Sequence, residues 1–311
     1  MKNTKGLLMV VLAGICWGVI SLMIKPLNEQ GLGSLEISAL RTIFAAIMLF
    51  VFLLIKDRNA LKIDIKDIWM FVGTGILSLT FFSVCYFYTI VNSGAAIAVV
   101  LLYTSPVFVM LMSAVIFKEK LTPKKVLCLI LTLAGCTLVA GLIGNTTALG
   151  LKAIIVGLGA GFGYALYSIF GTFATKKYKS LTITFYTLLL AGVALAVFAG
   201  PAKLIKQINL DTIPYLLSIA LICTVIPYIA YTYGLAGMEA GMAAVLVTIE
   251  PLVGSLIGIF IWKEEATAYK IIGILMIFAA IVVLGLSATE TGSTKKENRC
   301  ASGPKNSKTT E

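Results

Sequence analysis

Apolar residues dominate the chain in long runs that charged and turn residues interrupt. Ten of these runs are long enough to cross the hydrocarbon core of a bilayer, which takes about 20 apolar residues in a helix. They lie near residues 7–24, 36–55, 68–90, 95–117, 124–143, 151–174, 181–199, 213–233, 241–261 and 269–287. Because lipid offers no hydrogen-bond partner to a peptide group, each run is predicted to be a helix. The sequence therefore predicts an all-α integral membrane protein with ten transmembrane helices.

The composition narrows the classes of function. Hydrophobic residues make up 59% of the chain and charged residues 13%, whereas a soluble domain has about 25% charged residues. Histidine does not occur in the sequence, which excludes histidine metal sites and Ser-His-Asp or Cys-His nucleophiles. The six cysteines form no C-x-x-C pair, and no nucleotide-binding loop is present. We therefore predict no metal, no cofactor and no direct use of ATP.

Positive charge is distributed unevenly between the loops. Of the 25 lysines and arginines, 18 lie in the two tails and in the loops that follow the second, fourth and sixth runs. Six others lie in the remaining loops, and Arg41 lies within a run. Lys and Arg mark the cytoplasmic side of membrane proteins. Both termini are therefore predicted to be cytoplasmic, in a cytoplasmic membrane, and nucleic acid is not predicted as a partner despite the net charge of +11.

The second half of the chain repeats the first. Displacing the sequence by 145 residues aligns 86–140 with 231–285 without a gap. This displacement places Tyr86 on Tyr231, Pro106 on Pro251 and Lys118-Glu119 on Lys263-Glu264, and a displacement of 147 pairs Trp17 with Tyr164. We predict one repeat over 1–143, a second over 150–287 and a polar, flexible cytoplasmic tail over 288–311.

Each predicted repeat holds five helices, so the second copy enters the membrane in the opposite direction. Inverted repeats are a plan of secondary transporters, in which the substrate site lies near the bilayer midplane. We expect two five-helix bundles that enclose a solute pocket and expose it to each face in turn.

At this point the sequence resembles the ten-helix EamA-type family of the drug/metabolite transporter superfamily, over roughly 7–287. The residues that carry the resemblance are Trp17-Gly18, Arg41, Pro106, Lys118-Glu119, Glu250-Pro251 and Lys263-Glu264. Helices 4 and 9 of that family usually end in Gly-Glu, and lysine replaces this glycine here in both copies. The resemblance implies an ion-gradient-driven transporter of small metabolites, often amino acids, and it is nearly silent on the substrate.

Glu250 is the sharpest candidate for a functional residue. It lies near the middle of the run 241–261, where a charged side chain costs about 2.5–3.5 kcal/mol and usually faces an interior cavity. Pro251 removes a backbone hydrogen bond and is expected to kink the helix. A carboxylate beside freed carbonyl groups suits a proton or a substrate amine, while a structural hydrogen bond to a neighbouring helix is the alternative. The matching residues in the first repeat are Ser105 and Pro106.

Arg41 lies about five residues inside its predicted helix, roughly 8 Å from the outer surface. We expect it to pair with a carboxylate, Glu264 or Glu250, and the alternatives are snorkelling outward or binding a substrate carboxylate. Glu119 and Glu264 end helices 4 and 9. They are predicted to be solvated or salt-bridged helix ends, or gates that form on one side at a time.

Aromatic residues recur at corresponding places in the two repeats, namely Trp17 with Tyr164 and Tyr86 with Tyr231. They are predicted to form a shared wall around the central cavity, where aromatic faces hold a cation or an apolar side chain. The expected partners are membrane lipid and a small-molecule substrate, with proton coupling or exchange both open. A membrane-embedded enzyme acting on a lipid-linked substrate and a channel remain the alternative functions, and monomer and homodimer remain open.

Overall fold

The computed structural model describes residues 2–141 and 151–301, and every regular element in those two ranges is helical. The first repeat consists of α1 (Lys2–Gly18), α2 (Ser21–Glu29), α3 (Ser34–Lys56), α4 (Ile68–Val72), η3 (Gly73–Thr80), α5 (Phe81–Ser93), α6 (Ala95–Leu102), α7 (Ser105–Ile116) and α8 (Pro123–Val139). The second consists of α9 (Leu151–Ala174), α10 (Ser180–Ala199), α12 (Ile213–Ala220), η4 (Leu221–Val225), α13 (Ile226–Leu235), α14 (Ala240–Leu246), α15 (Ile249–Phe260) and α16 (Ala268–Ala301).

These elements join into the ten predicted membrane segments, so the predicted fold class is confirmed. Nine segments of the described chain have the length and apolarity to cross a bilayer. The tenth is α8, whose 17 residues are of the same apolar kind and pack along α16. Short helical turns η1 (Arg58–Leu61) and η2 (Ile65–Asp67) and the helix α11 (Pro201–Gln207) lie in the connections.

Several segments are discontinuous at corresponding places in the two repeats. The fourth breaks between α6 and α7, just before Pro106, and the ninth breaks between α14 and α15, just before Pro251. Proline lacks the N–H that would continue the helix, so the kink expected at Pro251 is present. The third and eighth segments each contain a π-helical stretch, η3 and η4. Such stretches are frequent at functional sites.

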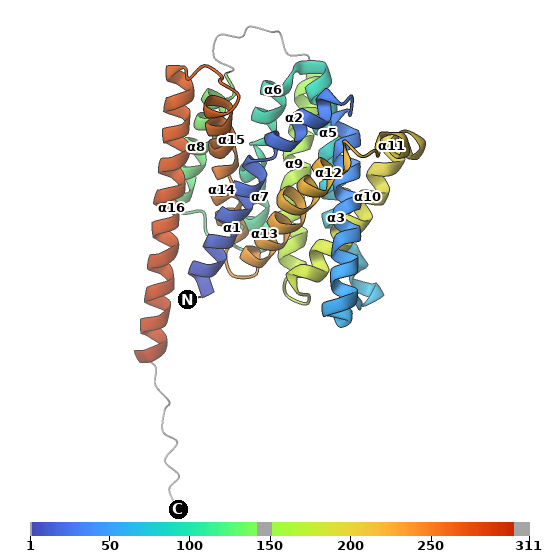
Figure 1. Ribbon diagram of the computed structural model, residues 1–311. Helices are drawn as coiled ribbons and strands as arrows, with labels where there is room; N and C mark the ends of the chain where they lie inside the picture. Colours follow the sequence, from blue (N-terminus) through green and yellow to red (C-terminus); the bar gives the residue numbers. More distant parts are fainter. Residues whose placement is uncertain (1, 142–150, 302–311) are drawn as a thin grey trace, which may run out of the picture.

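The two repeats cross the molecule in opposite directions, as Figure 1 shows: the chain begins at the end of the bundle toward which α16 descends, and α9 starts from the opposite end. We call these ends the terminal face and the distal face. The backbone of α16 stays helical to Ala301, which differs from the tail predicted from 288. No proline interrupts the helix before Pro304. Residues 302–311 of the predicted tail lie outside the described residues.

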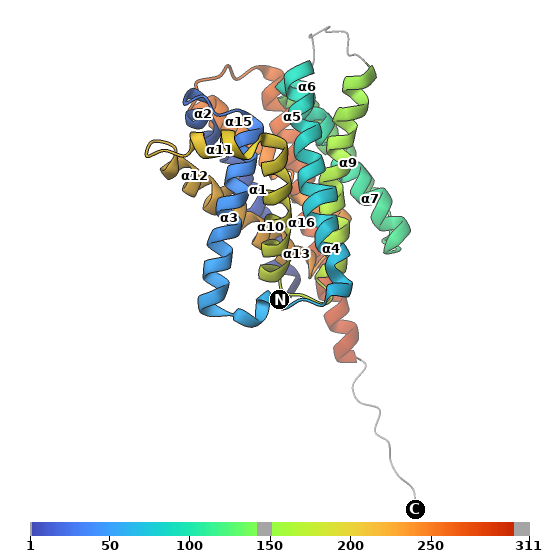
Figure 2. The ribbon, with the colours of Figure 1, turned by 90° about the vertical axis from the view of Figure 1, so that its right-hand side faces the viewer.

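The repeats interlock instead of forming two separate bundles. Helix α3 packs on its counterpart α10, and α8 packs on its counterpart α16. Helix α1 packs on α13 and α15, while α9 makes the equivalent contacts with α5 and α7. Figure 2 shows α3, α10, α5 and α9 crossing the molecule together. The two repeats therefore do not form separate bundles, because helices of both repeats pack against one another throughout the core.

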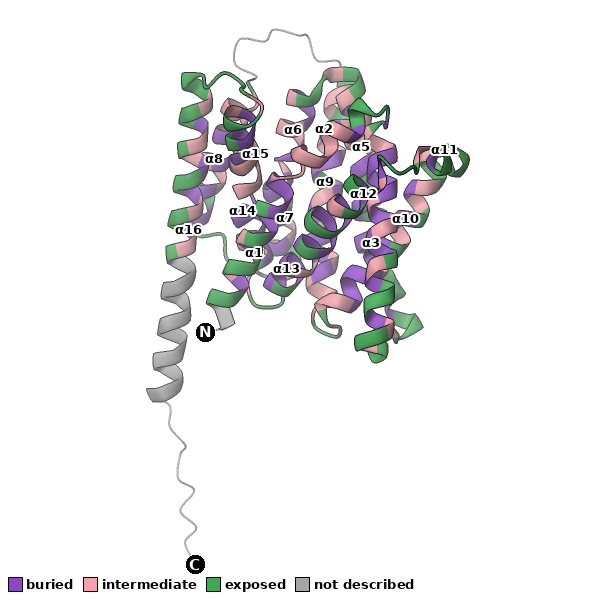
Figure 3. Cartoon of the chain, in the orientation of Figure 1, coloured by how far each residue is buried: buried purple, intermediate pink, exposed green. Residues whose placement is uncertain are grey.

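Burial follows this interlocked arrangement. The main hydrophobic cluster joins Val10 and Trp17 to Leu188 and Leu246 across the two repeats. Exposed apolar side chains include Ile55, Val115 and Val197. Figure 3 shows exposed positions, in green, along the outer helices of the molecule. In a bilayer these exposed apolar side chains carry no hydrophobic penalty, because the hydrocarbon core is as apolar as they are.

Glycines bring helices of different repeats into backbone contact. A Cβ at Gly14 would lie 2.7 Å from the carbonyl oxygen of Val247, and one at Gly18 would lie 2.8 Å from that of Glu250. In the other repeat, a Cβ at Gly161 would lie 2.7 Å from the carbonyl oxygen of Leu101. Small residues of this kind allow membrane helices to approach closely. Helix α1 therefore lies directly on the break between α14 and α15.

Ion pairs tie both ends of α3 to the second repeat. Near the terminal face Lys179, which precedes α10, donates to Asp57 at 2.8 Å, and this hydrogen bond lowers the pKa of Asp57. Near the distal face Lys203 of α11 pairs with Glu36. A displacement of 146 residues places Asp57 on Lys203 but Glu36 on Thr182, so the two ion pairs are not equivalent in the two repeats.

The contact of α1 with the break in the ninth segment predicts the effect of added methyl groups. Gly14→Ala forces a Cβ against the Val247 carbonyl and Ile249, and such overpacking costs about 1–3 kcal/mol. We expect a lower melting temperature in detergent. The matched control is Gly254→Ala, whose Cβ would meet only the Gly18 carbonyl at 3.7 Å. Equal melting temperatures for the two variants would contradict the close approach.

Candidate functional site

A pocket with a volume of about 510 Å³ lies between helices of both repeats. Its walls include Trp17 and Gly18 of α1, Tyr86 of α5, Tyr103 after α6, and Glu250 and Ser255 of α15. At its rim lie Glu264, Glu265 and Thr267 of the α15–α16 connection, and these residues are exposed. The pocket therefore opens at the distal face. Of the predicted site residues it contains Trp17, Tyr86, Glu250, Pro251 and Glu264.

Glu250 is an acid in the first turn of α15. Glu250 lies at the pocket because α14 ends before the turn at Val247–Thr248 and α15 begins directly after it. Within the described part of the chain its carboxylate makes no hydrogen bond and no ion pair with another side chain. The first turn of a helix favours a negative charge. The arrangement leaves the carboxylate available to a ligand in the pocket.

Arg41 of α3 is the cation that interacts electrostatically with Glu250. Its Nη1 donates to Thr224 Oγ1 at 3.4 Å, and Thr224 in η4 donates in turn to the carbonyl of Ile219 at 3.0 Å. The expected pairing with Glu264 is not found, because Glu264 pairs with Lys270 at 2.7 Å. Across residues 2–141 and 151–301 no carboxylate forms a salt bridge with Arg41.

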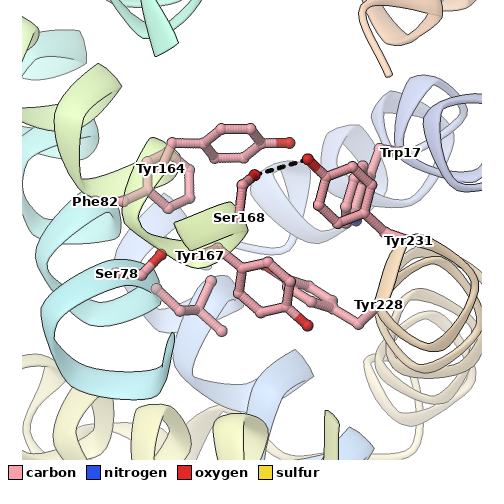
Figure 4. A pocket seen from close by; sticks show the side chains of 9 residues that line it. Trp17, Ser78, Phe82, Tyr164, Tyr167, Ser168, Tyr228 and Tyr231 are labelled. Atoms are coloured by element: carbon pink, nitrogen blue, oxygen red, sulfur yellow. Dashed lines mark hydrogen bonds between the residues drawn. The ribbon is translucent and has the colours of Figure 1, made fainter. Parts of the chain in front are cut away.

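An aromatic layer closes the pocket toward the terminal face. Trp17 contacts Tyr228 and Tyr231 with ring centroids 5.2 and 5.7 Å apart, and it contacts Tyr164 at 6.4 Å. Figure 4 shows these rings around a second cavity of about 10 Å³, which is room for roughly one water molecule. Tyr231 is held there by a hydrogen bond of 2.7 Å with Ser168. Of the four predicted aromatic residues, Trp17, Tyr164 and Tyr231 come together, whereas Tyr86 lines the larger pocket. Trp17 borders both cavities, so this layer forms the floor of the larger pocket.

The repeat-equivalent tyrosines occupy different surroundings. Tyr86 lines the open pocket, whereas Tyr231 lies in the aromatic floor. Trp17 borders both cavities, and its counterpart Tyr164 borders the small one. Ser105 and Pro106 are buried at the start of α7 and are not among the residues that line these two cavities. The same sequence pattern therefore yields an open arrangement on one side and a closed one on the other.

The two predicted gate residues also differ in their contacts. Glu119 accepts hydrogen bonds from the backbone N–H groups of Ala240 at 2.8 Å and Gly241 at 3.2 Å. It therefore joins the end of the fourth segment to the start of the ninth. Glu264 instead accepts a hydrogen bond from Lys270, a residue of its own repeat. Lys118 and Lys263, which precede the two glutamates, have left-handed φ angles of 56° and 57°, the conformation that favours glycine.

Sequence reasoning missed part of the pocket wall. Gly254 and Ser255 carry no sequence signal beyond their position one helical turn after Glu250, and Ser21 lies at the break between α1 and α2. That break has no counterpart in α9, which is continuous. Within the described ranges no group of three or more acids and cysteines gathers as a metal site. The pocket wall is therefore built from aromatic, small and charged side chains.

The comparison with known families agrees with this geometry. The sequence model of the EamA-like transporter family matches residues 4–141 and again residues 151–286. The two matches cover the two repeats and most of the chain. The chain therefore belongs to the EamA-like transporter family, and it is a multi-pass membrane transporter.

Relatives of similar length support the same class. An uncharacterized transporter of Archaeoglobus fulgidus is 28% identical over 283 residues, which cover 88% of this chain and 94% of the relative. The uncharacterized inner membrane transporter YicL of Salmonella typhimurium is 24% identical over 300 residues, with 92% and 97% covered. A protein of known crystal structure has the same fold, with a TM-score of 0.76 at 15% identity over 93% of this chain and 99% of that chain.

The open pocket and the closed floor predict different reactivities for introduced thiols. In a background without the six native cysteines, Gly254→Cys places a thiol on the pocket wall, and Ser78→Cys places one beside the small cavity. We expect a charged maleimide to label the first roughly tenfold faster or more in detergent, because Ser78 is 2% exposed and only the thiolate in contact with solvent reacts. Similar rates at the two positions would contradict the arrangement.

Proposed function

We propose that the protein is a secondary transporter that carries a small metabolite across the cytoplasmic membrane by alternating access. The observation that carries this proposal is the one-sided pocket of about 510 Å³ with the unpaired acid Glu250 in its wall. A carrier needs a solute site that reaches one face at a time, which this pocket provides at the distal face. A channel needs a continuous path, and the aromatic floor beneath the pocket blocks one.

The distribution of charge orients the protein in the membrane. The terminal face carries the loops with Lys62, Lys120 and Lys177, and retained positive charges mark the cytoplasmic side. We assign the terminal face to the cytoplasm and the distal face to the outside. The inner membrane location in the name of the relative YicL supports the cytoplasmic membrane as the location of this protein. The conformation described here is then open to the outside.

Glu250 lies in the pocket wall, and Arg41, which is not among the residues that line the pocket, interacts electrostatically with this acid. These two charges favour a solute that carries both signs. Glu250 is suited to an ammonium group, Arg41 is suited to a carboxylate, and the rings of Tyr86 and Tyr103 offer aromatic faces to the remainder of the solute. An amino acid or a related amphipathic metabolite satisfies all three. Because Glu250 lies in the pocket without a protein partner, it is also the group that can exchange a proton for the solute. This is the proposed basis of gradient coupling.

The repeats supply the second conformation. Exchanging their arrangements places Tyr231 on an open wall and Tyr86 in a floor, and it transfers the closing contact from Glu119 to Glu264. We propose that these two glutamates are gates, Glu119 inside and Glu264 outside. Interlocked inverted repeats have this property because each has already adopted the conformation that the other takes up.

The role of Glu250 predicts the effect of removing its charge. Glu250→Gln in proteoliposomes is expected to lose solute uptake driven by a pH gradient, while its expression and melting temperature stay unchanged. The substrate is found first with the wild-type protein, on a panel of amino acids and related metabolites. The matched control is Glu265→Gln, an exposed acid at the rim of the same pocket.

Exchange without a gradient separates the two roles of the acid. A variant that retains exchange but not gradient-driven uptake assigns Glu250 to the proton, and one that loses both with weaker binding assigns it to the solute. Full gradient-driven uptake by Glu250→Gln would end the proposal for this residue.

A further inference from the structure

The closure at the terminal face contains an ion pair in addition to the Glu119 contact. Lys125 at the start of α8 donates to the carbonyl of Lys120 at 2.9 Å and pairs with the carboxylate of Glu239, the residue before α14. The side chain of Lys125 is 9% exposed and that of Glu239 is 45% exposed. Two carboxylates, Glu119 and Glu239, therefore bridge the first repeat and the second at this face.

The distal face has repeat equivalents of Glu119 and Lys125 but no equivalent of the Glu239 carboxylate. The displacement of 145 residues places Glu119 on Glu264 and Lys125 on Lys270, but it places Glu239 on Gly94. Gly94 has a φ of 87° and a ψ of 159°, a conformation that is essentially restricted to glycine. The distal closure therefore has no carboxylate at the position where the terminal closure has one.

Exchange of the two arrangements shows the consequence. In the structure Lys125 pairs with Glu239 and Lys270 pairs with Glu264, while Glu119 binds the first amides of α14. In the exchanged arrangement Glu264 accepts hydrogen bonds from the first amides of α6. Lys125 then forms an ion pair with Glu119, as Lys270 does with Glu264 in the structure. Lys270 faces Gly94, which offers no carboxylate. That state leaves Lys270 and Glu239 without their partners. It has one ion pair fewer than the state described here.

We infer that the Lys125–Glu239 pair biases the transporter toward the conformation in which the pocket is open at the distal face. The inference rests on the proposed alternating access, and it assigns a function to Glu239, a residue away from the solute pocket. The pair adds stability only to the distal-open state because Gly94 removes its counterpart.

The test measures conformation in the absence of solute and of any gradient. Two reporters are placed separately in a background without native cysteines. Gly254→Cys lies on the wall of the open pocket, and Ser113→Cys lies at the closed terminal side, where Ser113 is 1% exposed and its Oγ would lie 3.5 Å from a Cβ at Gly241. Labelling rates with a charged maleimide in detergent report the two openings.

Glu239→Gln is expected to slow labelling at Gly254→Cys and to speed labelling at Ser113→Cys. The ratio of the two labelling rates is expected to change by roughly threefold to fivefold, the range of an ion pair that is partly exposed. Glu239→Asp keeps the charge and is expected to stay within twofold of the parent. Lys120→Gln removes an exposed charge from the same loop and is expected to have no effect.

The outcomes are separable from those of the transport assay, because labelling needs neither a substrate nor coupling. Opposite changes at the two reporters support the inference. Unchanged rates in Glu239→Gln would overturn it while leaving the proposed transport function intact. Faster labelling at both reporters would indicate a loosened fold and would also count against it.

Discussion

The structure depends on the backbone contact between α1 and the broken ninth segment. Gly14 and Gly18 allow α1 to reach the carbonyl groups of Val247 and Glu250, where any larger residue would meet an oxygen atom. A membrane provides no water for a polypeptide that leaves the helix. The break that carries Glu250 is therefore possible because a neighbouring helix of the other repeat covers it. The same contact therefore joins the two repeats and positions Glu250 at the pocket.

A symmetric frame holds chemistry that is not symmetric. The breaks before Pro106 and Pro251, the two glutamates after left-handed lysines and the aromatic pairs recur in both halves. The charges in the site do not recur: the second repeat has Glu250 where the first has Ser105, and the first has Arg41 with no corresponding cation. A symmetric pocket would present the same groups in both orientations. The acid in the pocket wall therefore comes from the second repeat alone.

Much of the fold could be predicted because bilayer thickness limits each apolar run. The run 151–174 coincides with α9, and the run 213–233 ends two residues before the helix does. Spacing along one chain does not reveal which helices touch, so the interlocking of α3 with α10 and of α8 with α16 could not be predicted. For the same reason the sequence could not decide between the two expected partners of Arg41. Glu264 pairs with Lys270 instead, whereas Glu250 interacts electrostatically with Arg41.

The amino-acid sequence by itself determined the ten helices and their inverted duplication. It also identified the polar and charged residues within or at the ends of the apolar runs, including Glu250, Glu119 and the tyrosines. These properties follow from hydrophobic length and from comparing the chain with itself. The tertiary structure alone decided which face is open, that Tyr86 lines the pocket while Tyr231 lies in its floor, and that Glu119 binds across the repeats while Glu264 does not. Two equivalent sequences can differ in this way because the packing of one repeat sets the space left to the other.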